Sequence, residues 1–108
     1  MQPLAFFADQ NSVKFFERQS DTIETVVLVA NTAQVIAVPT GARFCRMSLG
    51  AIFYYNPNGA ASIATASAST GGSKTVPAVE SPFISVDGIA SIGVIAPANG
   101  VMSVEWWS

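Results

Sequence analysis

From residue 25 to its end, the chain alternates short apolar runs with turn-forming residues, and this punctuation constrains the fold more than any other feature. In the last run, Val101 to Trp107, every second residue from Met102 to Trp106 is apolar, and polar side chains lie between them. A period of two is expected of a strand with one buried and one polar face. Trp107 falls in the more polar phase of this strand.

A second alternating run covers Arg43 to Tyr55. Its apolar phase begins at Cys45, whereas Arg46 lies in the opposite phase. Gly50 is predicted to bend or bulge this run into two strands, because glycine weakens a strand interior. Further strands are predicted at Thr25 to Ala30, Gln34 to Val38, Ser62 to Ala68, Lys74 to Val76, Phe83 to Val86 and Ile89 to Ala96.

Turn residues separate these runs. Asp87-Gly88 predicts a type I′ hairpin between the strands on either side. Turns are also predicted at Pro39-Thr40-Gly41, as type I with proline second, at Pro57-Asn58-Gly59 and at Asn99-Gly100. About eight short strands with this punctuation favour an all-β fold, an antiparallel β-sandwich that is jelly-roll-like.

The charged residues are concentrated at the N-terminus. The chain carries twelve, of which six fall in residues 1–24 and six in residues 25–108. An average chain of this length would carry roughly 27. High hydrophobicity with low charge excludes a disordered chain. The uneven distribution predicts an N-terminal arm, residues 1–24, followed by a β-sandwich body, residues 25–108.

Two segments give weaker patterns. In the arm, Ser12 to Gln19 has the length of two helical turns but no clean apolar stripe. Gly59 to Thr75 consists of Gly, Ala, Ser and Thr apart from Ile63 and Lys74. We expect a short strand there, followed by a loop centred on Gly71-Gly72.

The residue types disfavour an enzyme. There is no histidine, so the commonest general base and metal ligand is missing, and we expect no metal or other cofactor and no small-molecule substrate. Cys45 lies in an apolar phase and is expected to be a small buried residue. A glycosidase-like carboxylate pair drawn from Glu80, Asp87 and Glu105 is disfavoured, since a turn accounts for Asp87 and a solvent-facing strand position for Glu105.

Composition also disfavours several other classes. Five cations and a net charge of -2 provide no basic surface for nucleic acid. Arg43 and Arg46 are three residues apart on a strand and point to opposite faces, so they form no single patch and are expected to be isolated solvated or interface charges. No apolar run approaches the roughly 20 residues of a membrane helix, and the start at Met1 lacks the features of a secretory signal, so we expect neither a membrane span nor secretion. A single cysteine excludes an intramolecular disulfide.

Two binding classes remain open. Tyr54, Tyr55, Trp106 and Trp107 are candidates for stacking on sugar rings, although adjacent strand residues face opposite ways and half of these rings are expected in the core. The alternative is a structural subunit, because a neutral, alanine- and valine-rich surface suits burial against other subunits.

The arm contributes aromatic candidates for such an interface. Phe6, Phe7, Phe15 and Phe16 either anchor in grooves of a neighbour or fold back onto the core of their own chain. Together with Trp107, these four residues form the predicted partner interface.

Several segments carry a family resemblance. They are Asn31 to Gly41 (NTAQVIAVPTG), Val76-Pro77-Ala78, Phe83 to Gly88 and the ending Ile89 to Trp107 (IASIGVIAPANGVMSVEWW). This order of strands and turns resembles small virion structural proteins of tailed bacteriophages, particularly the β-sandwich cement or decoration proteins of the capsid. The arm lies outside the resemblance.

The resemblance implies a protein made in the host cytoplasm that ends on the capsid surface of the virion. Its partners would be the major capsid protein and further copies of itself, as a homodimer or homotrimer, and it would reinforce the shell. A tail, connector or fibre-base component is the alternative among virion proteins, and a carbohydrate- or receptor-binding module is the alternative of another class.

Overall fold

The computed structural model describes every residue except 9–14, 58, 64, 66, 68–71 and 77–78, and it is all-β within the described residues. The strands are β1 (Phe6–Ala8), β2 (Phe15–Glu17), β3 (Thr22–Leu28), β4 (Gln34–Ala37), β5 (Phe44–Leu49), β6 (Phe53–Asn56), β7 (Lys74–Val76), β8 (Val79–Glu80), β9 (Ile84–Ser85), β10 (Ser91–Ile95) and β11 (Gly100–Trp107).

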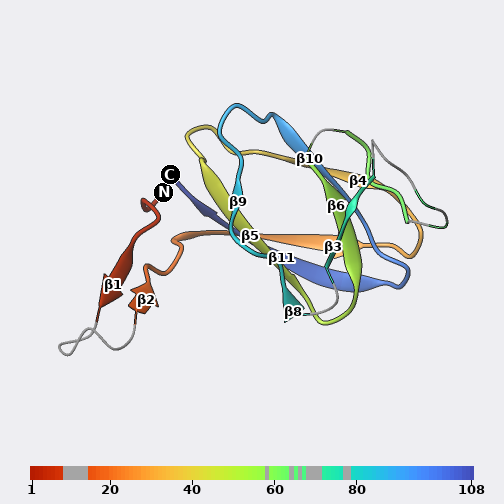
Figure 1. Cartoon of the computed structure of the whole chain (residues 1–108), viewed down its shortest axis with the longest axis horizontal. Helices are drawn as coiled ribbons and strands as arrows, with labels where there is room; N and C mark the ends of the chain where they lie inside the picture. Colours follow the sequence, from red (N-terminus) through yellow and green to blue (C-terminus); the bar gives the residue numbers. More distant parts are fainter. Residues whose placement is uncertain (9–14, 58, 64, 66, 68–71, 77–78) are drawn as a thin grey trace.

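Strands β3 to β11 form two antiparallel sheets packed face to face (Figure 1). One sheet has the order β4-β10-β6-β7 and the other the order β3-β11-β5-β8, with β9 also paired to β5. Strands that follow each other along the chain mostly belong to opposite sheets, and the last strand, β11, lies between β3 and β5. This is the winding of a jelly roll, which confirms the predicted sandwich.

The two alternating runs form strands with the predicted buried faces. In β11, Met102, Val104 and Trp106 are completely buried, and β5 buries Cys45 and Met47 in the same way. The run that continues past Gly50 does divide in two, because β5 and β6 lie in different sheets.

The hairpin predicted at Asp87-Gly88 is wrong. A turn is present, with the Val86 carbonyl accepting from the Ile89 amide, but only Gly88 has a positive φ, of 79°. A type I′ hairpin needs two such residues, whereas one at the third position fits a type II turn. The flanking strands β9 and β10 then join different sheets instead of pairing.

Other local predictions need smaller corrections. The turn near Pro39 closes from the Ala42 amide to the Pro39 carbonyl, so proline stands first and Gly41, with a φ of 88°, third. β6 ends before Pro57, as predicted, although Asn58 lies outside the described residues. No strand forms among the described residues of the 62–68 segment, and within the predicted 71–72 loop centre only Gly72 is described.

Strand β8 was not predicted from the sequence, and Ser81 explains why this strand opposite β5 is short. The Ser81 hydroxyl accepts from the Met47 amide at 2.8 Å, and the Ser81 amide donates to the Met47 carbonyl at 2.7 Å. The next residue, Pro82, has no N–H to donate. The pairing partner of β5 is therefore divided into β8 and β9.

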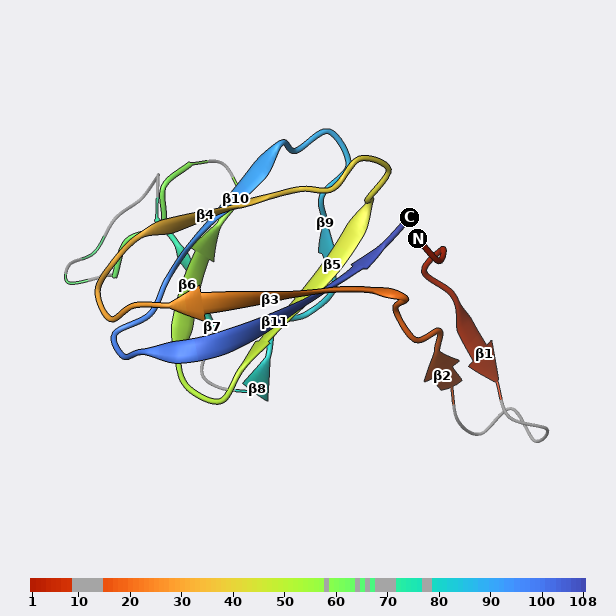
Figure 2. The same ribbon diagram turned by 180° about the vertical axis from the view of Figure 1, so that it is seen from behind.

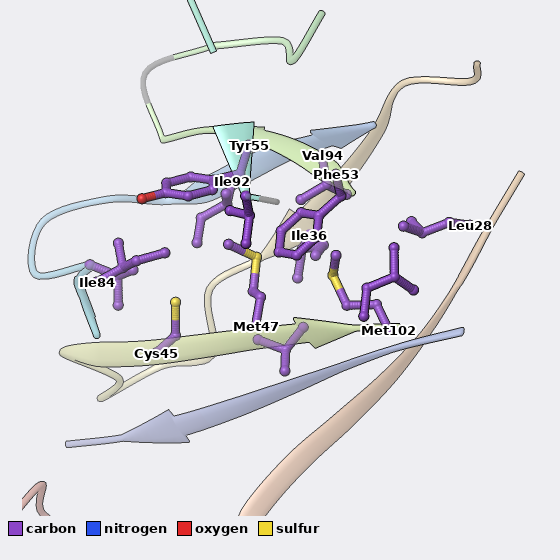
Figure 3. Close-up of a cluster of buried hydrophobic side chains, with 14 of the residues drawn as sticks. Leu28, Ile36, Cys45, Met47, Phe53, Tyr55, Ile84, Ile92, Val94 and Met102 are labelled. Carbon is purple, nitrogen blue, oxygen red and sulfur yellow. The ribbon is translucent and has the colours of Figure 1, made fainter. Parts of the chain in front are cut away.

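The core lies between the two sheets (Figure 3). Met47 of one sheet points toward Ile92 of the other, and Phe53 fills the space beside them. Burial raises the pKa of the Cys45 thiol to about 12. Burial, together with the nearby Cys45, also raises the pKa of Tyr55.

The N-terminal segment forms a hairpin that leaves the sandwich (Figures 1 and 2). Among the described residues, β1 and β2 pair only with each other, from Phe6 opposite Glu17 to Ala8 opposite Phe15. The hairpin lengthens the molecule to 48 Å and gives a radius of gyration of 14.8 Å, against about 13 Å for a compact chain of this size.

The described part of Ser12 to Gln19 contains strand β2 and no helix. Strand β3 begins at Thr22, which pairs with Trp106, so the boundary predicted between residues 24 and 25 falls inside this strand.

One glycine is required by close packing. A Cβ on Gly93 of β10 would lie 2.5 Å from the Gly59 carbonyl oxygen and 2.7 Å from the Ala61 nitrogen. Both contacts are backbone atoms, which move only if the 59–61 segment shifts.

We therefore predict that Gly93→Ala destabilises the fold by about 1–3 kcal/mol, through overpacking of this contact. Urea unfolding at neutral pH measures the effect. Gly50→Ala is the matched control, because nothing lies within 4 Å of its Cβ position. Equal unfolding midpoints for the two variants would contradict the close packing.

A second prediction concerns Cys45 at alkaline pH. The unfolded thiol loses its proton near the ordinary value of 9, whereas the folded thiol keeps it until about 12. Between these values the folded state holds the extra proton, so the free energy of unfolding falls by up to roughly 1.4 kcal/mol per pH unit.

The measurement is urea unfolding from pH 8 to pH 10. Tyr55, whose pKa is raised from the ordinary value of 10.0, contributes a slope of the same sign near the upper end of this range, and the control subtracts it. Cys45→Ala provides the control, since it removes the thiol and keeps every other titrating group. The same pH slope in both proteins would refute the assignment.

Candidate partner-binding surface

The outer face of the β3-β11-β5-β8 sheet is apolar at one end. In the register of β3 and β11, Val27 lies opposite Val101. Ile23 lies four residue pairs further along the same face, opposite Glu105, with the Thr25–Ser103 pair in between. Ile23, Val27 and Val101 are 61%, 64% and 61% exposed. Val27, Val101 and exposed Val29 also line an open groove of about 390 Å³. We call Ile23, Val27, Val29 and Val101 the apolar row.

The other end of the same face is charged and centred on Arg46 of β5. Its Nη1 and Nη2 atoms donate to the two carboxylate oxygens of Glu17, at 2.8 and 2.5 Å. Its Nε and Nη2 atoms donate to Glu105 Oε1, at 3.2 and 3.0 Å. Glu80 adds a third carboxylate, 3.5 Å from Nε. We call these four side chains the Arg46 cluster, and it joins the arm to three strands of the body.

Aromatic rings border the Arg46 cluster. The guanidinium carbon lies 5.0 Å from the ring centre of Phe83 and 5.7 Å from that of Trp107. Burial lowers the pKa of Arg46, but the hydrogen bonds and charges of Glu17 and Glu105 outweigh burial and raise it. Arg46 is therefore charged, and the three carboxylates around it outnumber its single positive charge.

Trp107 lies on the predicted outer face, where other side chains of the chain cover it; its contact with a partner stays a prediction. It lies outside the main core, yet its exposed fraction is 0%. Phe83 packs edge-on against it at 5.4 Å, and the indole N–H donates to the Arg18 carbonyl at 2.9 Å. The arm thus covers Trp107, so this residue presents no surface to a partner in this conformation.

Backbone contacts secure the base of the arm. The Ser108 amide donates to the Gln2 carbonyl at 2.9 Å, and the Leu4 amide donates to the Ser108 carbonyl at 3.1 Å. The Ser20 hydroxyl donates to the Trp106 carbonyl at 2.7 Å. The Asp21 carboxylate accepts from the Gln2 amide, and this hydrogen bond lowers the pKa of Asp21.

The predicted phenylalanines lie on the arm hairpin. Phe6 is 54% exposed and meets Phe83 edge-on at 5.5 Å. Phe7 is 50% exposed, with the Arg18 guanidinium 5.4 Å from its ring centre. Neither belongs to the sandwich core, so the alternative of completing that core is wrong for these two. Phe15 and Phe16 pair through their backbones in β2, and their side chains lie outside the described part of the structure.

The structure does not support the other sites considered from the sequence, namely the sugar-stacking rings and the solvent-facing Glu105. Tyr55, Trp106 and Trp107 are buried, so they provide no exposed platform for a sugar ring. Glu105 does not face solvent, because its side chain is 16% exposed and bound to Arg46. In the described ranges, no group of three or more acidic or cysteine side chains is arranged to hold a metal ion.

Sequence reasoning missed the Arg46 cluster. It treated Arg46 as an isolated solvated or interface charge, whereas three carboxylates surround it. Glu17 is 29 residues away along the chain and Glu105 is 59 away, so no local spacing links them. The apolar row could have been predicted in part. The C-terminal half of Thr22–Leu28 is apolar in both strand phases, so one of its apolar phases must face outward.

Comparisons with protein-family models, with curated proteins and with solved structures give no match for this chain. Among the described residues, none forms a helix long and apolar enough to cross a membrane. The two ends of this sheet face and the arm beside it are therefore the features that bear on function.

Proposed function

We propose that this protein is a structural subunit of a virion, a capsid cement or decoration protein that binds the major capsid protein and further copies of itself. The observation that carries the proposal is the apolar row, which exposes four aliphatic side chains on one sheet face. Val27, Val29 and Val101 line one groove, and clustered exposed apolar groups of this kind are typical of protein–protein contacts.

The energetics of such a surface suit a repetitive assembly. Full burial of a valine or isoleucine side chain contributes about 1.5–3 kcal/mol, and part of this gain is lost to the cost of association. A single small contact is therefore weak. Many symmetric copies, each binding at more than one point, give a stable coat.

The arm hairpin supports the same proposal from another direction. An isolated two-stranded hairpin is marginally stable in water, and this one carries two half-exposed phenylalanines. A partner surface that covers Phe6 and Phe7 would stabilise the hairpin. The resemblance to phage decoration proteins supplies the class of assembly.

We predict that replacing the central pair of the apolar row, as Val27→Thr with Val101→Thr, weakens binding to capsids. Threonine keeps the β-branched shape but adds a hydroxyl, so the loss should be roughly 1–2 kcal/mol per binding site, about tenfold in affinity. Co-sedimentation with capsids assembled without the protein measures it.

Val35→Thr is the matched control, because Val35 is 70% exposed but lies on β4 in the other sheet. Thermal unfolding of all variants confirms that the fold is kept. Wild-type binding by the double variant would remove the apolar row from the interface.

Copy number on purified particles tests the assignment itself. Many copies spread over the capsid surface in a cryo-EM map would support a decoration protein. A few copies at one vertex would assign the chain to the tail or connector, and its absence from particles would overturn the virion role.

A further inference from the structure

We propose that Arg46 is a positioning residue that fixes the direction in which the arm hairpin leaves the sandwich. Under this proposal, Phe6 and Phe7 are presented to a partner in one defined orientation. The inference deepens the proposed function and rests on it for the purpose of the arm. The orientation itself is a property of the isolated chain.

The geometry of the guanidinium carries the proposal. Arg46 donates through two nitrogens to both oxygens of Glu17 on β2, and through Nε and Nη2 to Glu105 on β11. A planar guanidinium that binds carboxylates along two of its edges fixes the angles between the bound groups as well as their distances. The position of Glu17, and with it the hairpin, is thereby defined relative to the sheet.

The other contacts at the arm base attach the arm but set its direction less strictly. Ring contacts such as Phe6 with Phe83 allow sliding and tilting. The hydrogen bonds at Ser108 and Ser20 hold the two chain segments that lead into the hairpin, not the hairpin itself. Only Glu17 of the paired β1 and β2 residues reaches a charged side chain of the body in the described structure.

Charge balance makes the arrangement depend on Arg46. Glu17 Oε1 and Glu105 Oε1 both bind the same Nη2 atom, so two carboxylates are held close across a single nitrogen. The side chains of Arg46, Glu17 and Glu105 are 14%, 23% and 16% exposed, which limits screening by salt. Without the cation, these carboxylates repel each other and drive β2 away from the sheet.

A fixed arm has a consequence for binding. A flexible arm must lose conformational freedom when it binds, whereas an arm already in its bound direction loses less. Arg46 would therefore raise partner affinity without touching the partner.

Residual dipolar couplings in the full chain test the proposal, since they report the orientation of each backbone N–H relative to the body. In the wild type, couplings of Phe6–Ala8 and Phe15–Glu17 should fit the alignment tensor of β3 to β11. In Arg46→Gln they should fall to about half or less of the fitted values, because the hairpin samples several directions. Thermal unfolding and the Trp106 indole resonance should report an intact sandwich.

Arg43→Gln is the matched control. Arg43 is more than half exposed and forms one ion pair with Asp87, 3.5 Å away, so its loss should leave the arm couplings unchanged. Arg46→Lys keeps the charge but loses the fork, and it should restore the couplings in part. A purely structural role would lower the unfolding temperature without changing the arm couplings of the folded protein.

If Arg46→Gln does not fold, Glu17→Gln provides the test instead. In that variant Arg46 still binds Glu105 and Glu80, so its charge remains paired. This variant should lower the arm couplings in the same direction. Unchanged arm couplings in a folded Arg46→Gln or Glu17→Gln protein would overturn the proposal. Since no capsid is present, this result is independent of whether the chain decorates particles.

Discussion

Two adjacent tryptophans on one strand organise this molecule. Because neighbouring strand residues face opposite ways, Trp106 enters the core between the sheets while Trp107 emerges on the outer face. An indole on an outer face must be covered, and the arm covers it together with Phe83. The Arg46 cluster forms over the same rings. The position of the arm therefore follows from a side chain that the sandwich cannot bury by itself.

The period-two pattern predicted much of the sandwich, because alternation reports directly which side chains are buried. It predicted β5, β6 and β11 and the break at Gly50. The pattern did not predict which strands pair. Asp87-Gly88 has the composition of a hairpin turn, but only Gly88 takes the left-handed conformation. The chain crosses from one sheet to the other at this turn. The arm hairpin was missed because its three-residue strands are too short to show a period.

The candidate surface was predictable only where it depends on local pattern. Phe6 and Phe7 stand out as adjacent aromatics in a charged segment, and they are half-exposed on the arm. Trp107 was correctly assigned to the outer face, but its cover comes from residues near the opposite end of the chain. The Arg46 cluster likewise joins Glu17 to Glu105 through the fold. Such contacts depend on topology, which residue spacing does not report.

The positions of the few charged residues of the body show how much electrostatics can contribute to recognition. Five of the six charged residues after residue 24 lie in ion pairs, namely Arg43, Arg46, Glu80, Asp87 and Glu105. The Arg43–Asp87 pair is neutral, and the Arg46 cluster, with three carboxylates around one guanidinium, carries about -2. This equals the small net charge of the whole chain, so electrostatic steering of a partner is weak. Recognition must then depend on short-range apolar contact and on shape. A surface of this kind gains from an arm held in a fixed direction, because geometry supplies the selectivity that its charges do not.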